Sequence, residues 1–325
     1  MQHIVYTRDL RKSFAAKKGP YEAVRGVDLA VAPGEIFGFL GPNGAGKTTT
    51  LKMLTTLMQP DSGDAQVSGF DVRKDPQEVR KRIGYVSQAG GTDRDAKGIE
   101  NLLLQGQLYG MTLECAKKRA AEVIEILNLT DCADRFVNTY SGGQRRRLDI
   151  GLGVMHRPDV LFLDEPTTGL DPQNRANLWD QIRSLREQGT TVFLTSHYLD
   201  EIDLLSDRLA IMDHGMIVAE GTPRDLKKEI AGDVVTIGLK KGQKIDLRSM
   251  ELFMRRPFVR EVTQAEQSMR LYVEDGETAL PQILRLLDEE KIHLQTIALS
   301  MPTLDDVFLK KTGRSLRESD TQGKS

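Results

Sequence analysis

A glycine-rich segment, Gly41 to Thr48, constrains the fold of this chain more than any other feature. It reads Gly-Pro-Asn-Gly-Ala-Gly-Lys-Thr, which fits the pattern of a glycine, four residues, a second glycine, a lysine and a hydroxyl residue. The apolar run at 35–40 predicts a buried strand before the segment, and residues 48–54 predict the first turns of a helix after it. The sequence therefore predicts a strand, a phosphate-binding loop and a helix, and with them a site for a nucleoside triphosphate.

The residue types of this loop suit phosphate binding. Glycines let several backbone N–H groups point at one anion, and the helix N-terminus adds its positive end. We expect Lys47 to place a positive charge on the β- and γ-phosphates and the Thr48 hydroxyl to complete a Mg²⁺ site. The predicted nucleotide-binding residues of the loop are Gly41, Pro42, Asn43, Gly44, Ala45, Gly46, Lys47, Thr48 and Thr49.

Two carboxylates end the next strongly apolar run. Residues 160–163 are all apolar, which predicts a fully buried parallel strand, and Asp164 and Glu165 follow at its carboxyl end. Ligands of open α/β sheets bind at that end of the strands. We expect Asp164 to bind Mg²⁺ and Glu165 to polarise an attacking water. A second buried strand at 191–196 leads to His197, and this position makes the histidine a site candidate.

A second anion site is predicted after a long helical segment. Apolar spacing from about 98 to 138 predicts a helical insertion between two strands of the sheet. Residues 141–144, Ser-Gly-Gly-Gln, then open another helix, whose N-terminus favours an anion. The next three residues, 145–147, are all arginine. Because the net charge of the chain is −2, we interpret them as a solvated helix face and not as a nucleic-acid contact.

Length and composition limit the other possibilities. A chain of 325 residues is long enough for two domains. The net charge of −2 gives no general attraction to nucleic acid, and the two cysteines form no CxxC pair and suit a reducing compartment. No signal peptide is visible, and no apolar run approaches the roughly 18 residues of a membrane span. We predict a soluble, cytoplasmic chain that needs a second chain for any work across a membrane.

The C-terminal part, 231–313, carries no catalytic motif. Its apolar runs predict the order β-α-β-β-α-β, which suits a small ferredoxin-like α+β module. We prefer dimer contact or packing on the first domain as its role, over regulation or docking to a membrane subunit. Residues 314–325 are polar and are predicted to be disordered. Near the N-terminus, residues 15–20 predict a polar turn between two strands.

Together these motifs resemble the ATP-binding subunit of ABC transporters. The resemblance covers about residues 1–230, with six elements in the family's order, and it is closest to the daunorubicin-resistance type of drug-exporter ATPases. The segments 93–98, 100–110 and 302–308 resemble that group. The resemblance implies an α/β P-loop ATPase domain with a mixed-sheet core, an antiparallel β subdomain and a helical subdomain at about 89–150, followed by the C-terminal domain.

The family's site roles carry over to matching positions of this sequence. The loop from Gly41 to Thr48 resembles Walker A, and Asp164 and Glu165 resemble the Walker B aspartate and the catalytic base. Gln88 resembles the Q-loop glutamine, which contacts Mg²⁺ and the attacking water and faces the membrane subunit. His197 stands at the switch position. The resemblance thus makes Glu165, His197 and Gln88 the catalytic residues, and Thr48, Gln88 and Asp164 the metal-binding residues.

The remaining roles concern the nucleotide. Phe14 aligns best with the aromatic residue that stacks on adenine, and Tyr21 is the competing aromatic. Asp171 lies in the D-loop. Tyr140 stands where the signature motif usually has leucine. The signature residues, which bind the γ-phosphate of the opposite protomer, are Ser141, Gly142, Gly143 and Gln144.

The resemblance implies a homodimer that closes on ATP and Mg²⁺ and drives a separate multi-spanning permease on the cytoplasmic side of the cell membrane. The expected function is export of a drug or other hydrophobic compound, with no nucleic-acid partner. The alternative is a non-transport ABC ATPase that acts with soluble partners. A GTPase is disfavoured, because the sequence lacks the Asn-Lys-x-Asp motif that reads guanine. The transported substrate, the direction of transport and the identity of the membrane partner stay open.

Overall fold

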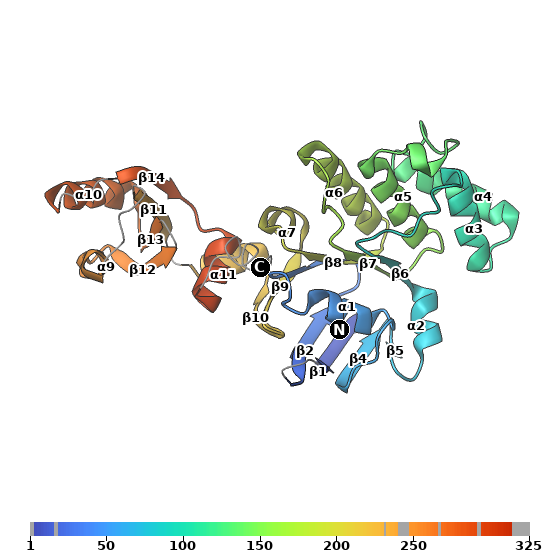
Figure 1. Cartoon of the computed structure of the whole chain (residues 1–325), viewed down its shortest axis with the longest axis horizontal. Helices are drawn as coiled ribbons and strands as arrows, with labels where there is room; N and C mark the ends of the chain where they lie inside the picture. The colour runs from blue at the N-terminus through green and yellow to red at the C-terminus, as the bar shows by residue number, and fades with distance from the viewer. Residues whose placement is uncertain are drawn as a thin grey trace. The chain divides into compact units, whose positions relative to one another are not determined.

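The computed structural model of the chain describes residues 3–15, 19–230, 232–239, 247–265, 268–290 and 294–313. The chain divides into two compact units, Met1–Glu220 and Gly221–Ser325 (Figure 1). Two predictions fall outside the described residues: the middle of the polar turn, 16–18, and the tail, 314–325. Within the described ranges, no helix has both the length and the hydropathy of a membrane span.

Six strands form the central sheet, in the order β10-β9-β3-β8-β7-β6. β3 pairs in parallel with β8 and β9, and β7 pairs in parallel with β6 and β8. All residues of β3, β7 and β8 are buried, because their apolar side chains are covered on both faces of the sheet. The strands are β3 (Ile36–Leu40), β6 (Ile83–Val86), β7 (Val160–Asp164), β8 (Thr191–Ser196), β9 (Arg208–Asp213) and β10 (Met216–Gly221).

A second, antiparallel sheet shares a core with the first. Its strand order is β2-β1-β4-β5, with β1 (Val5–Phe14), β2 (Tyr21–Val31), β4 (Ser62–Val67) and β5 (Phe70–Asp71). Helix α1 (Lys47–Leu54) lies between the two sheets (Figure 1). In the central sheet the ring of Phe193 lies 5.4 Å from Phe37, 5.6 Å from Phe39 and 5.5 Å from Phe162. This packing holds the strands whose carboxyl ends carry the candidate site.

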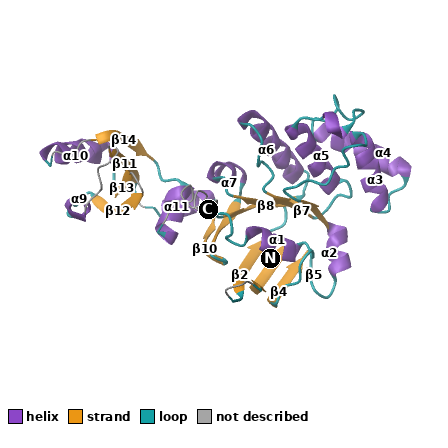
Figure 2. Cartoon of the chain, in the orientation of Figure 1, coloured by secondary structure: helices purple, strands orange, loops and turns teal. Residues whose placement is uncertain are grey.

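Helices cover the other side of the central sheet, where α5 (Gly142–Val154) and α6 (Pro172–Glu187) lie (Figure 2). The predicted helical insertion is divided into α3 (Gly98–Leu108), α4 (Leu113–Ile126) and the 3-10 turn η1 (Val137–Thr139). Gly110 has a φ of 82°, which ends the first helix, and the Thr112 side chain caps the second. The first unit also contains α2 (Pro76–Arg82) and α7 (Leu199–Leu205).

The second unit is built on an antiparallel sheet with the order β12-β13-β11-β14. Its elements are β11 (Asp233–Leu239), α9 (Leu247–Met254), β12 (Val259–Ala265), β13 (Ser268–Val273), α10 (Gly276–Glu289) and β14 (Leu294–Ser300). The order β-α-β-β-α-β is the predicted one, because alternating strands and the strongly amphipathic α10 enclose one apolar core. The assignment to the ferredoxin-like class stays a prediction.

Two short helices of this unit pack against each other: α8 (Pro223–Lys228) and α11 (Leu304–Thr312). The sequence predicts a first domain that ends near residue 230 and includes α8, whereas the structure divides the chain after Glu220. Helix α11 was not predicted. Its signal is a capping box, in which Thr303 and Asp306 satisfy each other's backbone N–H groups.

Candidate active site

Glycines allow the phosphate loop a backbone conformation that other residues would disfavour. Gly44 and Gly46 have φ values of 80° and 108°, in the left-handed region that favours glycine. A Cβ atom on Gly41 would lie 2.2 Å from the carbonyl oxygen of Met212. The loop therefore needs glycine at these positions to connect β3 to α1. Helix α1 begins directly after the third glycine, at Lys47.

Lys47 is held inside the loop, with only 4% of its surface exposed. Its Nζ atom donates to the carbonyl oxygens of Gly41 at 2.6 Å and Pro42 at 3.0 Å, and it lies 3.9 Å from Oε1 of Glu165. A buried ammonium group requires such acceptors. Phosphate oxygens carry charge and are stronger acceptors than carbonyls, so a bound phosphate can take their place.

A hydroxyl and a carboxylate meet at the start of α1. Thr48 Oγ1 donates to Asp164 Oδ1 at 3.1 Å, and Thr195 Oγ1 donates to the same oxygen at 2.7 Å. Asp164 is 4% exposed, so these hydrogen bonds compensate the burial of its charge. Mg²⁺ prefers hard oxygen ligands, commonly one or two protein oxygens together with phosphate oxygens. The side chains of Thr48 and Asp164 fit this ion.

Glu165 follows β7 with a φ of 45°, an uncommon backbone angle for a residue other than glycine. Its N–H group donates to two oxygen atoms of Thr195, the carbonyl oxygen at 3.2 Å and the side-chain Oγ1 at 3.1 Å. Three side chains surround Oε2: the Gln88 amide donates at 3.3 Å, the Thr168 hydroxyl donates at 3.2 Å, and Nδ1 of His197 lies 3.2 Å away. Oε1 is the oxygen that faces Lys47.

Opposing effects set the ionisation of Glu165. Burial raises its pKa, but the contact with His197, the charge of Lys47 and the Thr168 hydrogen bond lower the pKa more, so it lies below its ordinary value. Glu165 is therefore ionised at neutral pH. The structure thus brings six predicted site residues together, with Thr195 linking Asp164 to the Glu165 backbone; they are Lys47, Thr48, Gln88, Asp164, Glu165 and His197.

The second predicted anion site lies at the start of α5. Ser141 caps this helix: its hydroxyl accepts from the N–H of Gln144 at 3.1 Å, and the Gln144 side chain accepts from the N–H of Ser141 at 3.0 Å. A Cβ on Gly143 would lie 2.5 Å from Oδ1 of Asn174. Asp171 caps α6 and accepts from the N–H of Asn174 at 2.9 Å. Figure 1 shows α5 and α1 on opposite sides of the central sheet.

The two candidate base-stacking aromatics lie at one end of the β1–β2 hairpin. Phe14 and Tyr21 are cross-strand partners and are 37% and 51% exposed. The Tyr21 hydroxyl donates to the carbonyl oxygen of Gly44 at 3.2 Å, which places this ring beside the phosphate loop. The Nζ of Lys12 lies 5.9 Å from the centre of the Phe14 ring. Both aromatics therefore remain candidates.

The interpretation of 145–147 as a solvated helix face is wrong for its middle residue. Arg146 is only 8% exposed, because its guanidinium group binds backbone carbonyls inside the first unit. Sequence patterns did not indicate two further residues of the site, Thr195 and Thr168, which hold Asp164 and Glu165. The available signal for Thr195 was a hydroxyl residue near the carboxyl end of a buried strand, directly after the apolar residues 192–194.

A phosphate loop that feeds α1, faced by two carboxylates at the end of a parallel strand, defines a P-loop nucleotide-binding protein. Comparison with known proteins gives the family. Residues 24–168 match the ABC transporter family, and residues 221–312 match the C-terminal domain of DrrA1-3-like ATP-binding proteins. This chain belongs to the DrrA-type ATP-binding proteins of the ABC transporter family, which are ATPases.

The similarity to individual relatives extends over most of the chain. It is 43% identical to the daunorubicin/doxorubicin resistance ATP-binding protein DrrA of Streptomyces peucetius, over 92% of this chain and 91% of the relative. It is 41% identical to the doxorubicin resistance ATP-binding protein DrrA of Mycobacterium tuberculosis H37Rv, over 95% of this chain and 93% of the relative. It is 35% identical to the linearmycin resistance ATP-binding protein LnrL of Bacillus subtilis 168, over 97% of this chain and 100% of the relative.

Solved structures share the fold of the first unit. An ATP-binding cassette of an ABC transporter in its ADP conformation is 27% identical, with a TM-score of 0.60, and the match covers 69% of this chain and 93% of that one. A dimeric post-hydrolysis cassette bound to ADP and Pi has a TM-score of 0.62 at 24% identity. That match covers 67% of this chain and 98% of the cassette. The latter likeness concerns the fold alone.

Tyr140, which replaces the usual leucine before the signature, has a specific place. Its hydroxyl donates to the carbonyl oxygen of Cys132 at 2.6 Å, and the residue is 8% exposed. Burial raises the pKa of this phenol above its ordinary value, which keeps the hydroxyl protonated as a donor. A Cβ on Gly98 would lie 2.1 Å from the hydroxyl oxygen, so a glycine leaves room for the larger ring.

We predict that Tyr140→Phe lowers the free energy of unfolding by about 0.5–1.5 kcal/mol, because the Cys132 carbonyl loses its buried donor. The measurement is urea unfolding followed by fluorescence of Trp179, the single tryptophan of the chain. Tyr6→Phe, at a position that is 36% exposed, is the matched control and should change stability little. Equal stability of Tyr140→Phe and wild type would contradict a contribution from the hydroxyl.

Proposed function

We propose that this chain binds ATP with Mg²⁺ and hydrolyses it, with Glu165 as the general base for the attacking water. The observation that carries the proposal is the Glu165 carboxylate, whose Oε1 lies 3.9 Å from the Nζ atom of the phosphate-loop lysine, Lys47. Gln88, Thr168 and His197 hold Oε2, so Oε1 is the oxygen that accepts the proton of the water. A positioned base of this kind contributes roughly 10²–10⁴ in rate.

The other residues bind the triphosphate and stabilise its charge. Thr48 and Asp164 would hold Mg²⁺, which when bound would neutralise charge on the phosphate oxygens. Lys47 and the N-terminus of α1 stabilise the negative charge of the transferring phosphoryl group. The Gln88 amide and His197 hold the Glu165 carboxylate in position for the water. Phe14 or Tyr21 stacks on the base, since both are exposed at the end of the hairpin that brings Tyr21 beside the loop.

Two variants separate the roles of binding and catalysis. Glu165→Gln should keep the affinity for ATP and lose about 10²–10⁴-fold in kcat, because the amide cannot accept the proton. Lys47→Ala should lose ATP affinity, because the main positive charge of the loop is absent. Fluorescent-ATP titration and steady-state phosphate release measure the two quantities. Lys52→Ala, on α1 but outside the loop, is the control.

Either of two results would contradict these assignments. Wild-type turnover by Glu165→Gln would remove Glu165 as the base, and wild-type binding and turnover by Lys47→Ala would remove the phosphate-loop interpretation.

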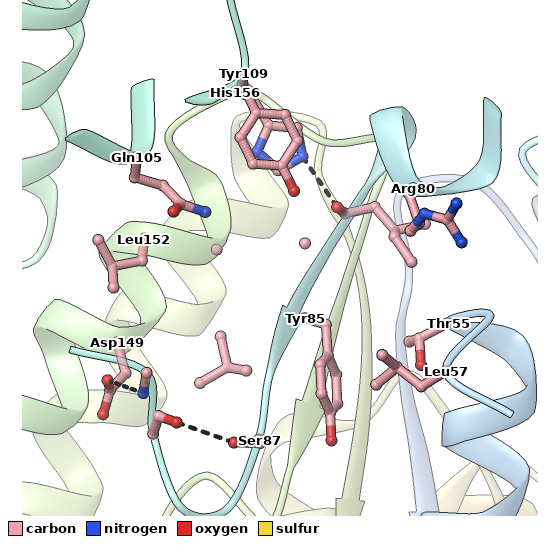
Figure 3. A pocket seen from close by; sticks show the side chains of 16 residues that line it. Thr55, Leu57, Arg80, Tyr85, Ser87, Gln105, Tyr109, Asp149, Leu152 and His156 are labelled. Atoms are coloured by element: carbon pink, nitrogen blue, oxygen red, sulfur yellow. Dashed lines mark hydrogen bonds between the residues drawn. The ribbon is translucent and has the colours of Figure 1, made fainter. Parts of the chain in front are cut away.

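We further propose that the ATPase drives a separate multi-spanning permease, from the cytoplasmic side of the membrane. The docking surface is a groove of about 360 Å³ between the central sheet and the helical region (Figure 3). Ser87 and Gly90, on either side of Gln88, line it, so an occupant would contact the segment that carries the glutamine. Tyr109, stacked on His156 with 3.7 Å between ring centroids, and Leu57, 59% exposed, give the groove an apolar rim.

The permease proposal predicts that Leu57→Asp weakens capture of a membrane protein. The tagged chain is purified from detergent-solubilised membranes of its host, and co-purifying proteins are quantified. Wild type should bring down a stoichiometric multi-spanning protein, and the variant should bring down several-fold less, because a charge then lies in the apolar rim. Leu204→Asp, at a residue that is 58% exposed and does not line the groove, is the matched control. Capture of soluble proteins alone would favour the non-transport alternative.

The exported compound is proposed from the relatives. The names of the similar proteins specify resistance to daunorubicin, doxorubicin and linearmycin, and one relative that is 36% identical is a Nod factor export protein. We propose export of a hydrophobic drug or natural product as the function of the assembled transporter. Substrate contacts then belong to the permease.

The ATPase is proposed to act as a homodimer. Lys47 and Glu165 form one half of a nucleotide site, and the signature residues 141–144 start a helix on the opposite side of the central sheet. A head-to-tail pair of chains would place the helix N-terminus of each signature against the γ-phosphate bound by the other chain. Two anions held between such helix ends explain how ATP closes the dimer.

A further inference from the structure

The side chain of one buried arginine, Arg146, donates three hydrogen bonds to backbone carbonyl groups beside the site. The guanidinium group of Arg146 donates from Nε to Pro166 O at 2.8 Å, from one terminal nitrogen to Asp164 O at 3.0 Å, and from the other to Ser87 O at 2.6 Å. Burial lowers the pKa of this arginine, while the nearby carboxylates of Asp149 and Asp164 oppose that effect. The three hydrogen bonds and these carboxylates compensate the burial of its charge.

The three carbonyl oxygens belong to two catalytic segments. Asp164 and Pro166 precede and follow Glu165, so Arg146 holds the backbone on both sides of the residue with a φ of 45°. An uncommon angle of this kind persists only where the surrounding structure determines it. Ser87 precedes Gln88, whose amide donates to Glu165. A single guanidinium therefore fixes the spacing between the proposed base and the glutamine.

Asp149 lies one turn further along α5, on the same face as Arg146. Its Oδ1 accepts from the N–H group of Gly91 at 2.8 Å (Figure 3) and from that of Thr92 at 3.1 Å. A Cβ on Gly90 would lie 2.6 Å from the Asp149 carboxylate, so the loop passes close to it. Asp149 is 6% exposed. The segment 87–92 is thus held at its start by Arg146 and at its end by Asp149.

We propose that Arg146 and Asp149 are positioning residues for ATP hydrolysis, which hold Glu165 and Gln88 in one fixed arrangement from helix α5. The proposal rests on the proposed role of Glu165 as the base. Neither side chain is given a direct role with nucleotide. Arg146 acts on the backbone of both catalytic residues, and Asp149 acts on the loop that carries Gln88.

The chemistry of the guanidinium explains why arginine is required. Its planar group presents five N–H donors in a rigid fork, so it can reach three carbonyl oxygens in different directions at once. A lysine ammonium keeps the charge but concentrates its donors on one atom at the end of a flexible stem. Arg146→Lys should therefore leave part of the carbonyl set unpaired and let the Glu165 segment shift. Misplacement of a catalytic group by 1 Å can cost about 10²-fold in rate.

The first experiment compares Arg146→Lys with Arg147→Lys. Arg147 is the neighbour in the same arginine triplet, and its guanidinium binds the carbonyl oxygen of Asn128 at 3.0 Å, away from the site. We expect Arg146→Lys to lower kcat about 10- to 100-fold with an unchanged Kd for ATP. Arg147→Lys should retain the wild-type kcat and Kd. Wild-type kcat in a folded Arg146→Lys chain would overturn the proposal.

Asp149→Asn keeps the test available if Arg146→Lys does not fold, because the amide has nearly the same size as the carboxylate. The neutral oxygen is a weaker acceptor for the N–H groups of Gly91 and Thr92. We expect a smaller loss of kcat, about 3- to 10-fold, again with an unchanged Kd for ATP. An unchanged kcat in Asp149→Asn would remove Asp149 from the proposal, and together with non-folding of Arg146→Lys it would overturn the proposal.

A double-variant cycle separates positioning from a general structural effect. If Arg146 acts through Glu165, adding Arg146→Lys to Glu165→Gln should lower the residual single-turnover rate by less than about 2-fold, because the base is already absent. If Arg146→Lys lowers the rate of Glu165→Gln by the same factor as it lowers the wild-type rate, Arg146 acts independently of Glu165. That result would overturn the proposal. Wild-type turnover by Glu165→Gln alone would refute the proposed function instead, so the two failures are distinguishable.

Discussion

Burial of two adjacent carboxylates at the end of β7 is the constraint on which the site depends. Asp164 is almost inaccessible, and an unpaired charge there would be costly, so its oxygens require donors. Thr48 from α1 and Thr195 from β8 supply them, and the next residue, Glu165, is held by three further side chains. The requirement to pair these charges draws the phosphate loop, two neighbouring strands and the Gln88 loop to one place.

Helix α5 connects the groups that the proposed cycle must coordinate. It begins after the capping residue Ser141, carries Arg146 and, one turn later, Asp149, and contributes Asp149 and Gly153 to the proposed permease groove. Its hydrogen bonds reach the residues on both sides of Glu165 and the segment around Gln88. A displacement of this helix would therefore move the signature and the catalytic segments together. This connection gives a structural reason why closure of a dimer, docking of a permease and hydrolysis can depend on one another.

The sequence predicted the parts of the site that depend on local patterns. The loop from Gly41 to Thr48 is recognisable because only glycine tolerates its backbone angles, and the carboxyl end of β7 follows from an unbroken apolar run. Contacts between distant segments could not be read in this way. Arg146 lies in a basic triplet that has the composition of a solvated surface, and only the folded chain reveals its carbonyl partners 18, 20 and 59 residues away. Helix α11 carries a local signal, its capping box, but the burial of its Asp305 and Asp306 depends on Arg270, which lies in β13.

The central claim is that this chain forms half of a nucleotide site, which a second copy completes. Light scattering of purified Glu165→Gln, with Mg-ATP and with Mg-ADP, tests it most directly, because this variant should hold ATP without hydrolysing it. The account predicts twice the monomer mass with Mg-ATP and the monomer mass with Mg-ADP. It also predicts loss of the ATP-dependent dimer when Ser141→Arg is added, since a bulky cation then occupies the cap of α5. A monomer that binds Mg-ATP without associating, or a dimer that Ser141→Arg leaves intact, would contradict the account.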